Sequence, residues 1–281
     1  ANEASELAGV EVTQGGLFFP QAGWINPRAL CDYLVDHPNV NIIYDFHVSE
    51  INQTDDGWLV NAEKKRATRK ASVVVIANAK DSLSFTQTNH LPVKTIRGQV
   101  THLPSSKNLS LKTVVCAEGY IAPSSGGLFC TGATFNLHSI DTQIRTEDHQ
   151  TNLNNLHQHL PAIAKNWSEI DAAELAGRVG FRCSLPDYLP VVGPLPLVEK
   201  MVEDFAPLRK NAKAAITCPG TYLPGLYINT GHGARGLTYT PLCAELLAAH
   251  INDELLPIPM ELANALNPAR FVIRDLTRNK R

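Results

Sequence analysis

The composition of the 281-residue chain excludes several classes of protein. Its 44% hydrophobic and 19% charged residues are typical of a globular protein of one large or two smaller domains. A formal net charge of −2 gives no global basic field for nucleic acid, and no apolar stretch is long enough to span a membrane. Six cysteines without a CxxC pair predict mostly buried, reduced thiols, and the chain opens without a signal peptide; both favour a cytoplasmic protein.

The first part of the chain predicts α/β structure. Asn26 followed by Pro27 is typical of a helix start, and the helix is expected to continue to about Asp36 and to bury Leu30, Tyr33 and Leu34. Strands are expected at 40–44, 48–53 and, after the turn signal Asp55-Asp56-Gly57, at 58–62. The β-branched run 72–79 indicates a parallel strand buried on both faces, and it ends in small residues that a ligand can approach.

The middle of the chain predicts an antiparallel sheet with helices. Strands are expected at 92–103, 113–122, 127–135 and 174–183. Between them, residues 146–160 have leucines at helical spacing, with Leu153, Leu156 and Leu160 on one face. Residues 186–196 are predicted to be a proline-rich loop, and the poorly patterned residues 201–215 an excursion or insertion.

Near the end of the chain, a GxGxxG sequence follows an apolar run and precedes a helix-like run at 237–250. Its residues are Gly231, His232, Gly233, Ala234, Arg235 and Gly236, with Leu237 next. A glycine turn between a strand and a helix brings backbone N–H groups and a positive helix end toward an anion or a ring. Too few residues follow for a complete dinucleotide-binding fold. The motif is therefore either a chance match or the closing piece of a flavoprotein.

Several separated stretches together resemble the D-amino-acid-oxidase-like FAD oxidoreductases. They are GGLFFPQAGWINP (15–27), the strand 73–79, IRGQV (96–100), GFRCSLPDYLPVVG (180–193) and the glycine turn with its helix (231–245). Within that superfamily, the opening GGLFFPQ, the ARGL turn, PLCAE (241–245) and the tail ALNPARF (265–271) are similar to the FAD domain of the MnmC family of bifunctional tRNA wobble-uridine modification enzymes. Each motif alone is weak, whereas their number and order make the resemblance strong.

The resemblance implies an α/β plus α+β fold. We expect a partial FAD-binding Rossmann-like domain at 1–90 and 216–281, with an inserted antiparallel-sheet substrate-binding domain at 91–215. The family's N-terminal GxGxxG and acidic ribose ligand, and the S-adenosylmethionine-dependent methyltransferase domain fused to it in the MnmC family, have no counterpart in this sequence. The chain is therefore expected to be a fragment of a longer protein, to bind FAD weakly and to be inactive alone.

The activity that the resemblance implies is the FAD-dependent removal of the carboxymethyl group from 5-carboxymethylaminomethyl-(2-thio)uridine at the tRNA wobble position. The products are 5-aminomethyl-uridine and glyoxylate. Two alternatives stay open: an oxidase of a free small amine such as glycine, sarcosine or a D-amino acid, and a non-catalytic remnant that docks tRNA or a partner domain.

Two residues are candidates for contact with the substrate. Arg182 lies among apolar residues, where a guanidinium needs a partner, and the resemblance implies that it binds the substrate carboxylate. The alternative is an internal ion pair with Asp187 or Glu174. Tyr120 resembles a tyrosine that family strands direct at the substrate, and a purely structural role is equally compatible with its sequence.

The cofactor residues come from the same resemblance. The turn Gly231–Leu237 is expected to place N–H groups at the flavin ring, with Arg235 serving flavin or substrate; a tight turn without a ligand is the alternative. His232 is discounted as a base, because the amine need only be neutral. The other expected cofactor residues are Val48 at the adenine, Ala77, Asn78 and Ala79 near the pyrophosphate and ribose, and Arg97, Gly98 and Gln99 near the flavin ring. A simple bend in a strand is the alternative for 97–99.

Metal binding is not expected, because the ten histidines form no HxxxH or HxH pattern and none lies beside the cysteines. A hydrolase is not supported, because GxSxG is absent. For contact with tRNA, the candidate basic groups are 64–66 with Arg69 and Lys70, and a basic tail at Arg270, Arg274, Arg278, Lys280 and Arg281. Solvated surface charge is the alternative for both.

Overall fold

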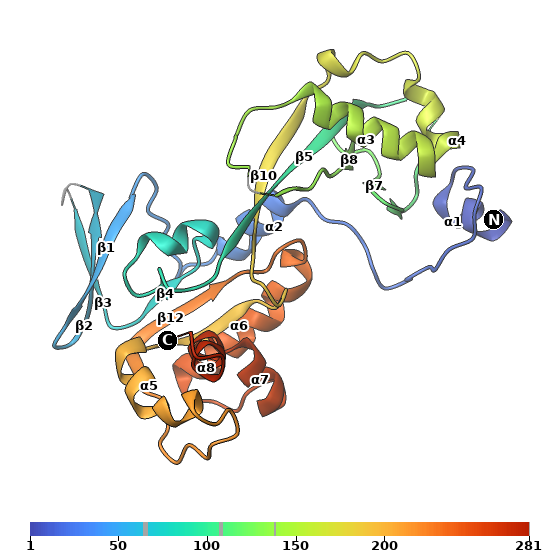
Figure 1. Ribbon diagram of the computed structural model, residues 1–281. Helices are drawn as coiled ribbons and strands as arrows, with labels where there is room; N and C mark the ends of the chain where they lie inside the picture. The colour runs from blue at the N-terminus through green and yellow to red at the C-terminus, as the bar shows by residue number, and fades with distance from the viewer. Residues whose placement is uncertain (64–66, 107–108, 138, 281) are drawn as a thin grey trace. The chain divides into compact units, whose positions relative to one another are not determined.

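A computed structural model describes residues 1–63, 67–106, 109–137 and 139–280, and these residues form two compact units (Figure 1). The antiparallel unit comprises Ala1–Val40 and Ile96–Phe181, and the glycine-turn unit comprises Asn41–Thr95 and Arg182–Arg281. These bounds differ from the predicted domain bounds, because residues 1–40 group with the antiparallel sheet and residues 182–215 group with the glycine turn. The assignment of one domain to FAD and one to substrate stays a prediction.

The antiparallel unit is built on a sheet with the strand order β10-β5-β8-β7-β6 and with β9 beside β5. The predicted strands at 92–103, 127–135 and 174–183 are confirmed, whereas the single strand predicted at 113–122 is instead a hairpin of two short antiparallel strands, with a turn between them. Their bounds are β5 Lys94–Pro104, β6 Val115–Cys116, β7 Tyr120–Ile121, β8 Leu128–Gly132, β9 Asn136–Leu137 and β10 Gly177–Ser184.

One face of this sheet packs against helix α3 (Thr146–His159), as Figure 1 shows. Leu153, Leu156 and Leu160 are buried as predicted, against the strand residues Leu103 and Phe129. The leucines recur at helical spacing along α3, and the strand residues that they contact lie on one face of the sheet. The apolar side chains buried between helix and sheet form the core of the unit. The remaining helices are α1 (Asn2–Ala8), α2 (Pro27–Val35), α4 (Pro161–Ala164) and the 3-10 helices η3 (Lys165–Trp167) and η4 (Ala172–Glu174).

Helix α2 forms where the sequence predicts it, but it does not bury the predicted face. The Asn26 side chain accepts hydrogen bonds from the amides of Arg28 and Ala29, and Pro27 is the first helical residue. Tyr33 and Leu34 are 78% and 64% exposed, and no residue of α2 is buried. The prediction of a buried stripe is therefore wrong for the described residues, because an apolar stripe is buried only where another element covers it. The strand predicted at 40–44 is also wrong, since these residues have no regular structure.

The glycine-turn unit contains two small sheets. Strands β1 (Val48–Thr54), β2 (Gly57–Ala62) and β3 (Thr68–Ala71) form an antiparallel sheet, which confirms the predicted hairpin. Strand β12 (Tyr222–Thr230) pairs antiparallel with β11 (Val191–Pro196) and parallel with β4 (Val74–Ile76). The helices are η2 (Ala79–Ser84), α5 (Val198–Asp204), η5 (Ala206–Arg209), α6 (Gly236–Asn252), α7 (Met260–Leu266) and α8 (Ala269–Thr277).

Three predictions about this unit need correction. The first part of the segment 201–215, predicted to be an excursion or insertion, belongs to the core instead, because Met201, Phe205 and Leu208 are buried against residues of α8. The predicted loop 186–196 ends in strand β11. Strand β4 is not buried on both faces: Ile76 is 3% exposed but Val75 is 39% exposed, so the described residues cover one face only.

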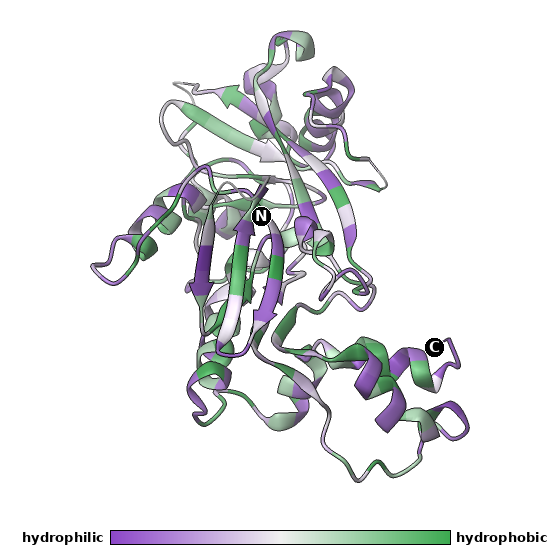
Figure 2. Ribbon diagram, turned by 90° about the vertical axis from the view of Figure 1, so that its left-hand side faces the viewer, coloured by the Kyte–Doolittle hydropathy of each residue, from purple (hydrophilic) through white to green (hydrophobic). Residues whose placement is uncertain are grey.

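Figure 2 shows that several strands contain both strongly hydrophilic and strongly hydrophobic residues. The cysteines are free, and only Cys183 and Cys243 are buried, which corrects the expectation that most are. Among the described residues, the helices are too short or too polar for any of them to cross a lipid bilayer.

Candidate functional site

The carboxyl ends of β4 and β12 lie side by side, so the valine-rich strand and the glycine turn are neighbours (Figure 1). Leu226 pairs with Val74 and Ile228 pairs with Ile76 in parallel register. Beyond the strands, the hydroxyl of Thr230 donates a hydrogen bond to the carbonyl of Ala79 (3.4 Å). In α/β proteins this edge of a parallel pair is where ligands bind.

The turn that follows β12 leaves several backbone donors without acceptors. Gly231 and Gly233 have φ values of +81° and +58°, which a glycine adopts without strain. Among the described residues, the amides of Ala234, Gly236 and Leu237 have no hydrogen-bond acceptor, and no side chain caps α6. Unsatisfied amides at the positive end of a 17-residue helix favour a negatively charged or electron-rich ligand.

The segment after β10 supports the turn from behind. The amide of Gly233 donates to the carbonyl of Cys183 (2.7 Å), and a Cβ on Gly231 would lie 2.5 Å from Cδ1 of Leu185. Burial raises the pKa of the Cys183 thiol, so this group is a neutral packing residue. This segment is part of the sequence resemblance, but the supporting role of Cys183 and Leu185 is not predictable from it, because side-chain packing against a turn leaves no local pattern.

His232 lies in the turn as a neutral imidazole. Its Nε2 is 2.9 Å from Oδ1 of Asn229, an atom that can only accept, which assigns the ring hydrogen to Nε2. Its Nδ1 is buried and has no partner among the described residues. Burial lowers the pKa of His232. The turn thus contains a lone pair on Nδ1 in addition to its free amides.

The other predicted cofactor residues of this unit lie near the same strands. Val48 begins β1 and packs against the buried cluster that includes Ile76 and Ile228. Ala77, Asn78 and Ala79 directly follow β4 and are exposed. The structure therefore brings the turn and residues 77–79 together, while their contacts with a cofactor stay predictions.

Asp187, one of the two alternative partners considered for Arg182, is bound by another arginine. Asp187 is held by Arg270 of α8 through Nε to Oδ2 (2.9 Å) and Nη2 to Oδ1 (3.2 Å). Burial opposes the charge of Asp187, but hydrogen bonds from Arg270 keep the pKa of this carboxyl below its usual range. Arg182 is a half-buried residue of β10, and the bond between Asp187 and Arg270 does not decide between the substrate and an internal bridge as its partner. The role of Arg182 at the substrate stays a prediction.

Arg97 of the antiparallel unit is fully buried and its guanidinium is satisfied internally. It forms an ion pair with Asp148 of α3 and donates to the carbonyls of Asp141 (2.8 Å) and Gln143 (2.6 Å). Burial opposes the charge of Asp148, yet hydrogen bonds from Asn136 and Arg97 lower the pKa of this carboxyl. Such a guanidinium holds the 141–145 segment against the sheet.

The alternation of side chains along β5 explains this orientation. Arg97, Gln99 and Leu103 point to the face covered by α3, where Leu103 is part of the core and Gln99 bonds both the amide and the carbonyl of Arg145 (2.8 Å each). Gly98, between them, has no side chain and is buried. The flavin contacts expected of Arg97, Gly98 and Gln99 stay predictions. The side chains of Arg97 and Gln99 already form hydrogen bonds within the antiparallel unit.

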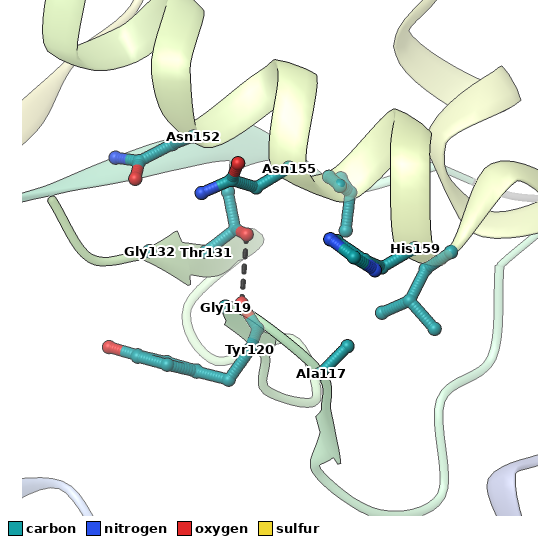
Figure 3. Close-up of a pocket in the computed structure, with 10 residues that line it drawn as sticks. Ala117, Gly119, Tyr120, Thr131, Gly132, Asn152, Asn155 and His159 are labelled. Carbon is teal, nitrogen blue, oxygen red and sulfur yellow. Dashed lines mark hydrogen bonds between the residues drawn. The ribbon is translucent and has the colours of Figure 1, made fainter.

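Tyr120 points away from α3, as Figure 3 shows. Its hydroxyl lies 3.8 Å from Sγ of Cys130, and Thr131 on the α3 side donates to its carbonyl (2.8 Å). The hollow between β7 and α3, lined by Asn155 and His159 among others, has a volume of about 10 Å³. This is room for about one water molecule, too little for a substrate. Contact between Tyr120 and substrate stays a prediction.

The two predicted basic patches have different outcomes. Residues 64–66 lie outside the described residues, and nearby Lys70 pairs with Asp56 (2.6 Å). In the tail, Arg270 is used by Asp187, and Arg274 lies over the ring of Phe271 at 4.7 Å. Two of the tail arginines therefore make contacts within the protein that their clustering in the sequence does not reveal.

The family of the chain follows from comparison with known proteins. The family model described as "FAD dependent oxidoreductase" matches residues 1–250. The chain belongs to this family. A glycine oxidase structure from Geobacillus kaustophilus covers 80% of the chain, with a TM-score of 0.59 at 20% identity, and 52% of its own chain is matched. An iminodiacetate oxidase structure from Chelativorans sp. BNC1 covers 77%, with a TM-score of 0.56 at 21% identity and 52% of its own chain matched. These likenesses confirm the predicted fold class.

Sequence relatives are more similar. The "tRNA 5-methylaminomethyl-2-thiouridine biosynthesis bifunctional protein MnmC" of Pseudomonas syringae pv. tomato is 43% identical over 280 residues, which are 98% of this chain and 42% of that protein. The protein of the same name from Saccharophagus degradans is 42% identical over 281 residues, which are 99% of this chain and 39% of that protein. The predicted resemblance is confirmed, and the chain spans about two fifths of the length of these relatives.

Proposed function

We propose that the chain is the flavin-dependent part of a tRNA-modifying oxidoreductase. Its substrate is 5-carboxymethylaminomethyl-(2-thio)uridine at the wobble position, and its products are 5-aminomethyl-uridine and glyoxylate. The observation that supports this most is the glycine turn at the carboxyl ends of β4 and β12, in a chain 43% identical to a protein named for thiouridine biosynthesis in tRNA. A fused methyltransferase domain is proposed for the longer protein.

The residues of the turn fit an FAD ring system. The amides of Ala234, Gly236 and Leu237 and the Nδ1 of His232 are unsatisfied polar groups gathered in one turn, and glycine at 231 and 233 lets a ring approach the backbone. When bound, FAD supplies the acceptor for the hydride that leaves the carbon between the amine and the carboxylate.

The protein residues position the substrate, whose amine must be neutral when the hydride leaves. In this proposal Arg182 binds the substrate carboxylate through its two parallel N–H donors, which fixes the carbon that loses hydride. Loss of the hydride and of the amine proton leaves a C=N bond, and water adds to its carbon. One hydrogen of the water goes to the nitrogen as the water oxygen bonds the carbon, and the second follows when the C–N bond breaks, so the nitrogen leaves as the aminomethyl group and the carbon as the aldehyde of glyoxylate.

Because the chain is expected to be inactive alone, the test is to incubate the longer protein that contains it with excess FAD and tRNA that carries the carboxymethylaminomethyl group. Glyoxylate release, with the matching mass loss at the wobble nucleoside, is the expected result. Arg182→Ala should abolish the release, because the carboxylate is no longer held. Oxidation of free glycine or sarcosine without any reaction of the tRNA would instead establish the small-amine alternative. Binding of tRNA without glyoxylate under saturating FAD would establish the docking remnant.

A further inference from the structure

Tyr188 is an exposed aromatic residue in an unfavourable backbone conformation. Its φ is +59°, a left-handed value that glycine and asparagine adopt readily and a bulky side chain rarely does. Its side chain is 72% exposed, so packing in the core does not explain the tyrosine. Strained residues that persist at an exposed position are concentrated at functional sites.

The loop that carries Tyr188 is fixed on both sides. The amide of Tyr188 donates to the carbonyl of Leu185 (3.0 Å), and Leu185 is 1% exposed. Asp187 is bound by both sides of the Arg270 fork, and Nη2 of Arg270 also donates to the carbonyl of Leu189 (3.0 Å). The ring of Tyr188 therefore projects from a rigid loop, which reduces the conformational entropy lost when a partner binds it.

The same loop borders the glycine turn. Leu185 packs on Gly231, and Oγ of Ser184 is 3.6 Å from the position of a Cβ on Gly233. The turn itself presents Arg235, whose exposed guanidinium donates to the hydroxyl of Tyr239 (3.1 Å). An exposed aromatic ring and an exposed guanidinium thus lie on two segments that pack together. Aromatic rings and guanidinium planes are the groups on which unpaired RNA bases stack.

We infer that Tyr188 is a stacking platform for an unpaired RNA base next to the reacting uridine. This inference rests on the proposed function for its choice of RNA as the partner. The inference extends the proposed function, because it assigns recognition of the RNA chain to a loop separate from Arg182, the residue proposed to bind the substrate carboxylate. The tyrosine ring provides a π-face for a base of any identity, and Arg235 provides a charge for the phosphate or a second stacking plane.

The test measures binding of a fluorescent single-stranded oligouridine to the whole chain by anisotropy, together with the melting temperature. Tyr188→Gly should weaken binding about tenfold, because one base–aromatic stack is lost, without lowering the melting temperature, because glycine suits φ +59°. Tyr188→Phe should bind like wild type, since it keeps the ring. Tyr44→Ala is the matched control: it removes an aromatic ring that is 78% exposed in the same unit, and binding should not change.

Equal binding by wild type and Tyr188→Gly would overturn the inference and leave the proposed function standing, since glyoxylate release is measured separately. Weakened binding in Tyr188→Phe as well as Tyr188→Gly would also overturn it, because a hydrogen bond of the hydroxyl and not stacking would be responsible. If the longer protein released glyoxylate from tRNA but the wild-type chain did not bind oligouridine, the inference would fall alone. Absence of both activities would remove the proposed function and the inference together.

Discussion

The buried polar centre around Arg97 and the glycine turn of β12 differ in how their polar groups are satisfied. The Arg97 guanidinium bonds Asp148, Gln99 and two backbone carbonyls and is 0% exposed. In the turn, three amides and the Nδ1 of His232 have no partner among the described residues. Both regions contain residues that the family resemblance assigns to the flavin. Satisfied groups stabilise the fold, whereas the polar groups of the turn that lack a partner among the described residues remain able to bond a ligand or another part of the protein.

The largest expected effect is a loss of stability when the buried polar centre around Arg97 is disrupted. Arg97→Met should lower the free energy of unfolding by about 3–5 kcal/mol, because it leaves the Asp148 carboxylate buried without its cation. Urea unfolding followed by circular dichroism measures this loss. Asp56→Asn is the control, because its pair with Lys70 is exposed on both sides and its loss should produce no measurable change. An Arg97→Met protein as stable as Asp56→Asn would show that the centre is not structural, and the flavin role of Arg97 would regain support.

The second effect concerns the turn. Gly231→Ala should destabilise the chain by about 1–3 kcal/mol, because the new Cβ would meet Leu185 at 2.5 Å and φ is +81°. It should also reduce FAD binding, measured by titration of flavin fluorescence, since the turn must shift. If Gly231→Ala kept its stability but lost FAD binding, Gly231 would be required for the ligand alone. The turn would then differ more clearly from the Arg97 centre, which stabilises the fold.

The sequence was sufficient to place the strands of the turn. A β-branched run and a GxGxxG turn each specify local structure, and two parallel strands in one sheet bring their carboxyl ends together, so the β4–β12 neighbourhood could be predicted. The hairpin of β1 and β2 and the leucine face of α3 were predictable for the same reason, because turn residues and periodicity are local signals.

The sequence was insufficient where long-range packing decides. Whether Arg97 faces α3 depends on which face of β5 the helix covers, and one residue of register reverses the answer. Asp187 and Arg270 are 83 residues apart, so their pairing leaves no local pattern. The apolar face of α2 led to a wrong prediction of burial, since periodicity describes a face but not what covers it.

The third effect depends on pH. Burial lowers the pKa of His149, whose Nδ1 lies 2.8 Å from the hydroxyl of Thr101. A histidine with a depressed folded pKa is neutral in the fold, so its contribution to stability is present above the unfolded pKa of about 6.5 and is lost as pH falls below it. The melting temperature of wild type should therefore decrease from pH 7.5 to 5.5 more than that of His149→Gln.

His157→Gln is the control for this measurement, because it removes an exposed histidine from the same helix. It should leave the pH dependence of the melting temperature as in wild type. Identical pH dependences in wild type and His149→Gln would mean that proton uptake on unfolding occurs elsewhere, for example at His232 or His250, whose pKa values burial also lowers.

The smallest expected effect is that of Gly236→Ala in the same GxGxxG motif. It should raise the free energy of unfolding, whereas Gly231→Ala should lower it. Gly236 begins α6, its φ is not positive, and a Cβ there would have only Cβ of His232 nearby, at 3.8 Å. Alanine restricts the unfolded chain more than glycine does, so Gly236→Ala should raise the free energy of unfolding by about 0.4–1 kcal/mol. Denaturant unfolding of both variants in parallel measures the difference. If Gly236→Ala were as damaging as Gly231→Ala, the third glycine of the motif would be required by a contact absent from the described residues, and FAD titration of the same variant would show whether the ligand makes that contact.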